Sequence, residues 1–139
     1  MKIKKDCFCG MYRYSIMSDD GRFCICSIQV EKEDERDKAR YIPDYIDKKV
    51  LYLTNFSTLA EYRHKGYATK LLKDVIRRFK GKYDVIHLNA CPYYCKGFDV
   101  VYKPPKGGLD MDKLTKFYES YGFKELRATR QGWRVMLLE

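Results

Sequence analysis

The stretch from residue 51 to residue 90 constrains the fold most, because it has the pattern of a strand, a helix and a second strand in direct succession. Between two β-rich segments, residues 51–59 and 85–90, apolar side chains recur at the spacing of one helical face. The members of this stripe are Ala68, Leu71, Leu72, Val75, Ile76 and Phe79. A strand, a helix and a strand in this order predict two parallel strands joined by a helical crossover.

The residues before this unit predict a hairpin followed by a loop. Residues 7–17 and 22–30 alternate between apolar and polar side chains, and Asp20 before a glycine is a turn signal. Residues 31–49 carry many charges of both signs and a proline, which predicts an exposed loop. A second long, irregular loop is expected at residues 91–108.

The residues after the unit predict a second helix and a closing hairpin. The helix is expected to begin at Asp110, its N-cap, and to end at Gly122. The hairpin is expected to pair residues 123–128 with residues 133–138. We therefore predict one domain, residues 1–139, with an α/β fold in which a mixed β-sheet of about six to seven strands is flanked by helices.

The net charge of +9 favours an anionic partner, which could be a nucleotide cofactor, a nucleic acid or an acidic protein surface. No apolar run approaches the ~18 residues of a membrane span. At the N-terminus, Arg13 interrupts the sequence before any signal-peptide core. We therefore expect a cytoplasmic protein without a membrane partner.

Six cysteines raise the question of a metal site or a disulfide framework. On the predicted first hairpin, Cys7 and Cys9 lie on one strand and Cys24 and Cys26 on the other, and the two pairs are expected more than ~10 Å apart along the ladder. Zinc would need all its sulfurs at ~2.3 Å. The sequence therefore predicts no metal site and reduced, partly buried thiols. The pattern does not explain the remaining two cysteines.

The junction between the first strand of the unit and its helix is a candidate anion site. The N–H groups of the loop and of the first helical turn point outward at one place, together with the positive end of the helix dipole. Gly66 allows a close approach of the backbone, and Arg63, His64 and Lys65 add positive potential. The alternative is that Gly66 only relieves a tight turn and that the charges are solvated. The residues alone leave both interpretations open.

Two motifs, in this order, resemble the GNAT superfamily of N-acyltransferases. Arg63-x-x-Gly66-x-Ala68 is similar to the acetyl-CoA motif of that family, an Arg or Gln followed by Gly and then Gly or Ala. Residues 117–123 are similar to its second motif, an aromatic-Tyr helix closed by Gly-Phe. The resemblance covers about residues 50–139. It implies an enzyme that transfers an acetyl group from acetyl-CoA to a primary amine by direct attack in a ternary complex.

The resemblance also implies roles for individual residues. The backbone of Phe56, Ser57 and Thr58 would pair with the pantetheine arm and the thioester carbonyl. Tyr118 would protonate the departing thiolate, and Asn89 would bond the pantetheine amides. The pyrophosphate would lie on the loop formed by Arg63, His64, Lys65, Gly66, Tyr67, Ala68 and Thr69. The residues alone also allow Tyr118 to be a core aromatic and Asn89 to satisfy a backbone group at a strand end.

The sequence departs from the family on the acceptor side. Tyr52 stands where some members carry a Glu as general base, so that base is missing. His87 or a chain of water molecules could substitute, although a single histidine on a half-buried strand is more often structural. The tight turn at residues 18–21 leaves no room for the two helices that usually follow the first strand, so we expect them to be missing. The acceptor pocket is then either open or rebuilt from residues 31–49 and 91–108.

A second class of function remains a weaker alternative, namely a GNAT-like protein that acts on or binds nucleic acid. Tyrosines that could stack on bases alternate with lysines in one loop, which could equally be an ordinary solvated loop. These residues are Tyr93, Tyr94, Tyr102, Lys96, Lys103 and Lys106. The predicted partners are acetyl-CoA and an amine acceptor of unknown identity, and a homodimer is left open.

Overall fold

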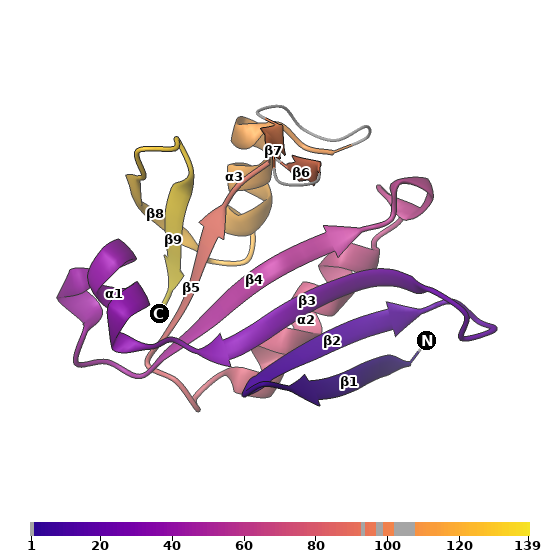
Figure 1. The fold of residues 1–139 in the computed structure, drawn as a ribbon, viewed down its shortest axis with the longest axis horizontal. Helices are drawn as coiled ribbons and strands as arrows, with labels where there is room; N and C mark the ends of the chain where they lie inside the picture. Colours follow the sequence, from indigo (N-terminus) through magenta and orange to yellow (C-terminus); the bar gives the residue numbers. More distant parts are fainter. Residues whose placement is uncertain (1, 93, 97–98, 102–107) are drawn as a thin grey trace.

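The computed structural model describes residues 2–92, 94–96, 99–101 and 108–139 (Figure 1). The elements are β1 Ile3–Phe8, β2 Met11–Met17, β3 Cys24–Lys32, α1 Glu35–Tyr41, η1 Pro43–Tyr45, β4 Val50–Thr58, η2 Ala60–Tyr62, α2 Tyr67–Phe79, β5 Val85–Ala90, β6 Tyr94–Lys96, β7 Asp99–Val101, α3 Met111–Glu119, β8 Lys124–Ala128 and β9 Arg134–Leu138. A seven-stranded sheet runs in the order β1-β2-β3-β4-β5-β9-β8. The predicted α/β fold with a mixed sheet is therefore confirmed.

The predicted crossover unit is present. α2 connects β4 to β5, and these two strands pair in parallel, whereas the other neighbours in the sheet are antiparallel. The apolar stripe forms the buried face of α2, and Leu71, Leu72 and Val75 are fully buried. The N-cap prediction for α3 is also confirmed, because the Asp110 side chain accepts a hydrogen bond from the Lys113 N–H at 2.9 Å.

The predicted first hairpin is present as β2 and β3, but its first strand begins later than predicted, because residues 7–17 are not one strand. Cys9 and Gly10 both adopt left-handed conformations, with φ of 49° and 77°, and turn the chain between β1 and β2. Two successive residues with positive φ make the tight turn that suits the twist of paired strands. β2 then forms a second hairpin with β3 around residues 18–23. The sheet gains an edge strand in this way.

Residues 31–49 were predicted to be an exposed loop, and this was also wrong. Asp34 caps α1 by accepting the Asp37 N–H at 2.8 Å. Tyr41 and Ile42 are buried against β4, β5 and β9. The buried Lys38 donates its ammonium protons to backbone carbonyls of the following turn, at 2.8 and 3.0 Å. The segment forms a short helix with only a small apolar face, so its mixed charges resemble those of an exposed loop.

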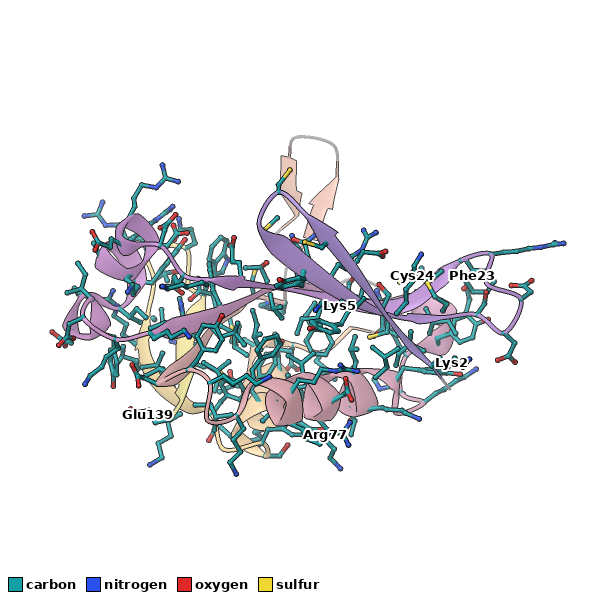
Figure 2. The ribbon with its side chains drawn as sticks, turned by 90° about the horizontal axis from the view of Figure 1, so that it is seen from below. Lys2, Lys5, Phe23, Cys24, Arg77 and Glu139 are labelled. Atoms are coloured by element: carbon teal, nitrogen blue, oxygen red, sulfur yellow. The ribbon has the colours of Figure 1, made fainter. Side chains whose placement is uncertain are left out.

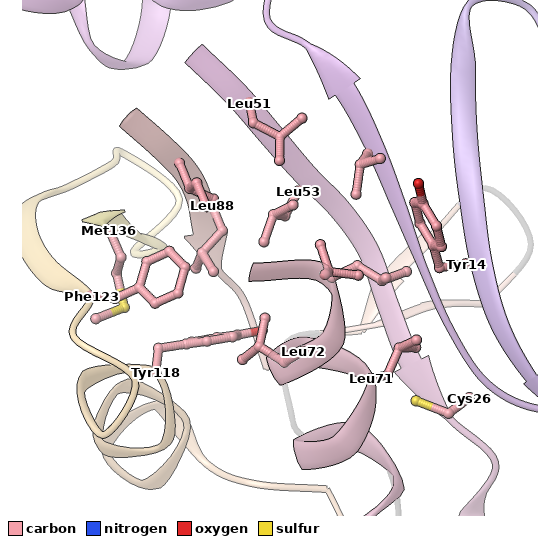
Figure 3. Close-up of a cluster of buried hydrophobic side chains, with 14 of the residues drawn as sticks. Tyr14, Cys26, Leu51, Leu53, Leu71, Leu72, Leu88, Tyr118, Phe123 and Met136 are labelled. Carbon is pink, nitrogen blue, oxygen red and sulfur yellow. The ribbon is translucent and has the colours of Figure 1, made fainter. Parts of the chain in front are cut away.

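The helices cover the two faces of the sheet unequally. α2 and α3 pack on one face and enclose the main core (Figures 2 and 3). Arg77 points from α2 away from the sheet (Figure 2). α1 and η1 pack on the opposite face, over a smaller cluster that includes Val50 and Val85 at the start of β4 and β5. The second face is therefore covered near the N-terminal ends of the two parallel strands.

The sheet splits between β4 and β5. Their parallel pairing ends at Leu53 and Leu88. Beyond these residues β4 continues along β3 to Thr58, and β5 continues along β9 to Ala90. Asn55, with φ of 48°, and a register shift against β3 mark a β-bulge that bends β4. The two strands consequently diverge toward their C-terminal ends (Figure 1).

The predicted loop at residues 91–108 is described in part. β6 and β7 form a separate two-stranded antiparallel sheet, so this segment contains regular structure that was not predicted. The base-stacking hypothesis rests on side chains that lie outside the described part of the chain. Among the described residues, no helix has the length and apolarity to cross a bilayer.

Candidate functional site

A cavity of about 770 Å³ lies where β4 and β5 diverge, between the C-terminal ends of these strands and the helices α2 and α3. β4 contributes Phe56, Ser57 and Thr58, and the residues after β5 contribute Cys91 and Pro92. The α2 end of the cavity is formed by the loop and the first helical turn. The α3 side is formed by apolar and aromatic side chains. The cavity is therefore polar at one end and largely apolar along its length.

The N-terminus of α2 is the anion-binding end of this cavity. Gly66 is the N-cap of the helix and makes no side-chain cap, and the first turn contains no acidic residue. The first N–H bonded within the helix is that of Lys70, to the Gly66 carbonyl at 3.0 Å. The N–H groups of Tyr67, Ala68 and Thr69 precede it, and these residues line the cavity. These donors and the helix dipole favour an anion here.

Gly66 is required in this loop by its conformation. Its φ is 87°, a region that side chains rarely adopt, and a Cβ built at this position would meet no atom within 4 Å. Any side chain would therefore project into open space at the anion-binding end. The glycine keeps this space free for a ligand.

Arg63 joins the loop to the end of β4. Its Nε donates a hydrogen bond to the Thr58 carbonyl at 3.2 Å. The Thr58 hydroxyl in turn donates to the Cys26 sulfur at 3.2 Å, which ties β4 to β3. Burial raises the pKa of the Cys26 thiol to about 11, so this sulfur stays protonated at neutral pH. The loop is therefore anchored to the strand that borders the cavity.

Tyr118 reaches the cavity from α3 and is only 7% exposed. Its ring packs against Phe117 and Phe123, with centroid distances of 5.3 and 5.9 Å. Figure 3 shows its hydroxyl directed toward Leu72 of α2. Burial raises the pKa of the Tyr118 phenol, and the thiols of Cys26 and Cys91 raise it further. The phenol is therefore neutral at physiological pH, and its side chain lines the cavity.

The cavity brings together most of the residues that the sequence singled out. Phe56, Ser57, Thr58, Arg63, His64, Gly66, Tyr67, Ala68, Thr69 and Tyr118 all line it. Lys65 does not, and its ammonium lies 5.6 Å from the centroid of the Tyr62 ring. Asn89 does not line it either, because its side chain lies on the other face of the sheet, with His87 and Tyr52. The roles assigned to these residues remain predictions.

Several residues that line the cavity were not predicted as part of a site. Leu114 and Phe117 of α3 pack against the main core and form the apolar wall of the cavity. Tyr62 and Cys91 were given no role. The sequence could have indicated Tyr62, because it directly precedes Arg63. It could not have indicated Cys91, which lines the cavity only because β5 ends beside β4.

Comparison with known families gives one match. The model of the acetyltransferase (GNAT) family matches residues 5–98, which is more than half of the 139-residue chain. A search of curated proteins finds no match.

Solved structures with the same fold include several acetyltransferases. PH1933 from Pyrococcus horikoshii is 21% identical, with a TM-score of 0.58 over 94% of this chain and 64% of its own. The Bacillus subtilis N-acetyltransferase YlbP, in complex with coenzyme A, is 15% identical, with a TM-score of 0.56 over 91% of this chain and 66% of its own. Arabidopsis thaliana Naa50, in complex with the bisubstrate analogue CoA-Ac-MVNAL, is 15% identical, with a TM-score of 0.56 over 93% and 72%. The chain thus spans somewhat less than two thirds of the length of PH1933.

Proposed function

The chain belongs to the acetyltransferase (GNAT) family, and from this premise we propose that it is an enzyme that transfers an acetyl group from acetyl-CoA to a primary amine. The proposed acceptor is an amine of a small molecule, a lysine side chain or a protein N-terminus. The observation that carries the proposal is the cavity, which joins a helix N-terminus, a diverging strand end and a buried phenol in one space.

The anion-binding end of the cavity fits the pyrophosphate of acetyl-CoA. The open space beside Gly66 and the N–H groups that begin α2 would accept the pyrophosphate oxygens. The diverging end of β4, from Phe56 to Thr58, would hold the pantetheine arm by backbone hydrogen bonds. Two proteins with this fold, YlbP and Naa50, are in complex with coenzyme A and with a CoA-containing analogue, which supports this assignment.

Bound acetyl-CoA supplies an activated acetyl group as a thioester. The chain's own residues would hold it so that an amine can attack directly, which converts an encounter of two substrates into a positioned reaction. In the transfer, the amine nitrogen forms a bond to the carbonyl carbon, the carbon–sulfur bond breaks, and its electron pair remains on sulfur. The neutral Tyr118 would give a proton to that sulfur and regain one from solvent, and the neutral amine would lose one proton to solvent after its attack.

Thermal unfolding with and without acetyl-CoA tests the donor site. A ligand that binds only the folded state raises the melting temperature, by an amount that grows with its concentration relative to its Kd. Gly66→Glu places a carboxylate in the anion-binding space, so acetyl-CoA should no longer raise the melting temperature of this variant.

Gly81→Glu is the matched control. Gly81 follows the other end of α2, has a nearly equal φ of 83°, and a Cβ there also meets no atom within 4 Å. Both substitutions therefore carry the same backbone strain, but only the first touches the cavity. The shift should persist in Gly81→Glu. An equal shift in both variants would exclude the loop as the donor site, and released-thiol assays with amines then test the transfer itself.

A further inference from the structure

A second cavity lies at the C-terminal end of α2, on the face of the sheet that α2 and α3 cover. Its volume is about 180 Å³, and a cavity of ~150 Å³ in a protein core is large enough to bind benzene. Its walls come from the end of α2, the turn after it, the start of β5, the turn after α3 and the end of β9. We call this cavity the α2 C-terminal pocket.

The α2 C-terminal pocket is separate from the donor cavity. The two share no lining residue in the described part of the chain. They lie at opposite ends of α2, and a helix of 13 residues is about 20 Å long. Figure 2 shows Glu139, which lines the pocket, and Phe23, whose ring centroid lies 5.9 Å from that of Tyr62 in the donor cavity, at opposite ends of the molecule. No residue of the pocket takes part in the transfer proposed above.

Aromatic rings form a large part of the pocket walls. The rings of Phe79 and Tyr83 meet edge to face, with centroids 6.0 Å apart and planes at 67°. Gly81, with φ of 83°, turns the chain between them, and an isolated bridge pairs Lys80 with Tyr83. Tyr121 adds a third ring from the turn after α3. Aromatic faces carry a negative potential, so walls of this kind attract cations.

The Tyr83 ring already contacts one ammonium group of the chain itself. Lys49 Nζ lies 4.7 Å from the centroid of this ring, although Lys49 does not line the pocket. A cation within ~6 Å of a ring centroid gains a favourable cation–π interaction. The pocket wall is therefore a surface that can hold an ammonium ion.

The charged side chains of the pocket are acidic in excess, in a chain with a net charge of +9. Two exposed carboxylates, Asp84 and Glu139, line it together with one exposed ammonium, Lys80. Asp84 accepts the Lys49 N–H at 2.8 Å and Glu139 accepts the Tyr45 hydroxyl at 2.9 Å. Neither carboxylate has an ion pair among the described residues. The remaining negative charge favours a cationic ligand.

The arginines of the last turn of α2 do not cancel this charge. Arg77 and Arg78 both bond the Asp74 carboxylate, at 2.5 Å, and neither lines the pocket. The negative end of the α2 dipole, in contrast, lies at the pocket and adds to the attraction for a cation.

We propose that the α2 C-terminal pocket binds a small methylated ammonium ion, whose methyl groups contact the rings and whose charge is balanced by Asp84 and Glu139. The methyl groups suit walls that also contain Ile76 and Leu138, because they need no hydrogen-bond acceptors. A primary ammonium would need an acceptor for each of its three N–H groups. The inference does not depend on acetyl transfer, and it adds a second ligand site to the chain.

An NMR titration of the isotope-labelled protein with choline tests the proposal. We expect saturable shifts of the amide signals of Gly81 and Tyr83, and no shift of those of Ala68 and Thr69 at the donor cavity. The neutral isostere dimethylbutanol, in which carbon replaces the nitrogen, should bind about tenfold more weakly or worse, because it keeps the shape and loses the cation–π attraction. Sodium chloride at the same concentration controls for ionic strength.

Three variants test the ring and the sign of the charge. Tyr83→Leu removes a wall and should raise the Kd of choline about tenfold. Asp84→Asn keeps an oxygen for the Lys49 N–H and removes a charge, so it should raise the Kd about two- to fivefold. Lys80→Gln removes a competing positive charge and should lower the Kd by a similar factor.

Tyr12→Leu is the matched control for Tyr83→Leu. The Tyr12 ring also contacts a lysine, with Lys5 Nζ 4.3 Å from its centroid, but it does not line the pocket. The Kd of choline should therefore be unchanged in Tyr12→Leu. Melting curves identify any variant that fails to fold, and the exposed Asp84 and Lys80 keep the test decisive if Tyr83→Leu is one of them.

Two probes distinguish the sources of a methylated ammonium group. Choline represents a free small molecule, and the amide of Nα-acetyl-Nε-trimethyl-lysine represents a modified protein side chain; binding of either at Gly81 and Tyr83 supports the proposal, and the tighter one identifies the source. Equal Kd values for choline and dimethylbutanol, or a choline Kd that does not respond to Asp84→Asn and Lys80→Gln, would overturn it. The absence of amide shifts with both cations would overturn it as well.

Discussion

Tyr118→Phe separates the two roles that the sequence left open for this residue, a proton donor and a core aromatic. The substitution deletes the hydroxyl at the cavity and keeps the ring between Phe117 and Phe123. If Tyr118 protonates the departing sulfur, the loss should fall on kcat. If it only packs, the loss should be small, because every ring contact survives.

The magnitude follows from the chemistry of the step. A positioned general acid contributes about 10²–10⁴-fold to the rate, and a hundredfold loss corresponds to about 2.7 kcal/mol in the barrier. Figure 3 shows the hydroxyl beside Leu72, which follows the residues of α2 whose N–H groups form the anion-binding end. The Kd of acetyl-CoA should therefore change by less than about twofold, and kcat should fall about 10²-fold or more.

Tyr118→Phe should also change how the free energy of unfolding depends on pH. The folded protein holds Tyr118 neutral because burial raises its pKa. Above about pH 10 the phenol ionises in the unfolded chain but not in the folded one, so unfolding becomes easier by up to about 1.4 kcal/mol per pH unit. This loss is absent below pH 10 and grows until the pH reaches the folded pKa. Tyr118→Phe should remove it, so its melting temperature should fall less steeply than that of wild type above pH 10.

The assay combines single-turnover thiol release at saturating acetyl-CoA with melting curves from pH 7 to pH 11. Tyr121→Phe is the control, since Tyr121 lies on the following turn, also contacts Phe117, and faces a different pocket. It should retain wild-type turnover. A kcat of Tyr118→Phe within about twofold of wild type would refute the proton-donor role, and the pH dependence of stability alone would then show a buried core tyrosine.

Two further predictions concern the core and the charge. Leu72→Ala should lower the free energy of unfolding by about 2–5 kcal/mol, because Leu72 is fully buried between α2 and the sheet; the exposed Leu126→Ala should change it by less than about 0.5 kcal/mol in the same denaturant titration. Affinity for labelled RNA or duplex DNA at physiological salt should be no tighter than ~10⁻⁴–10⁻⁶ M. Submicromolar, sequence-dependent binding that is lost when the exposed Lys80 and Lys82 are changed to Gln would favour the nucleic-acid alternative.

The sequence predicted those parts of the fold in which local pattern and tertiary packing agree. α2 has a continuous apolar stripe, and its buried members are the ones that the spacing selects. Asp110 caps α3 because its side chain satisfies an N–H group within its own turn. The loop at Gly66 was identified for the same reason, since a glycine and the start of a helix are neighbours in sequence and together make the anion-binding end.

The elements that were not predicted depend on features that the local sequence indicates only weakly. The turn between β1 and β2 needs a non-glycine residue, Cys9, in a left-handed conformation. Alternation between apolar and polar residues continues through it, so the pattern suggests one long strand. α1 and its C-cap contribute only two apolar side chains to the core, Tyr41 and Ile42. The charges around them predict an exposed loop. Both elements become visible only through the partners against which they pack.

The candidate site also has a part that the sequence predicted and a part that it did not. Its donor half is built largely from two continuous segments, the end of β4 with the α2 loop and the part of α3 from Leu114 to Tyr118, and these carry motifs. On the opposite face of the sheet, hydrogen bonds join Glu33, His87, Asn89 and Tyr52, and the bonded partners Glu33 and His87 are 54 residues apart in sequence. Tyr52 was recognised only as the absence of an expected glutamate, and His87 and Asn89 as isolated polar residues. Their connection requires the register of β3, β4 and β5, which brings Tyr52 between Glu31 and His87. The absence of a glutamate at position 52 can therefore be interpreted only when the structure shows which residues of the neighbouring strands surround Tyr52.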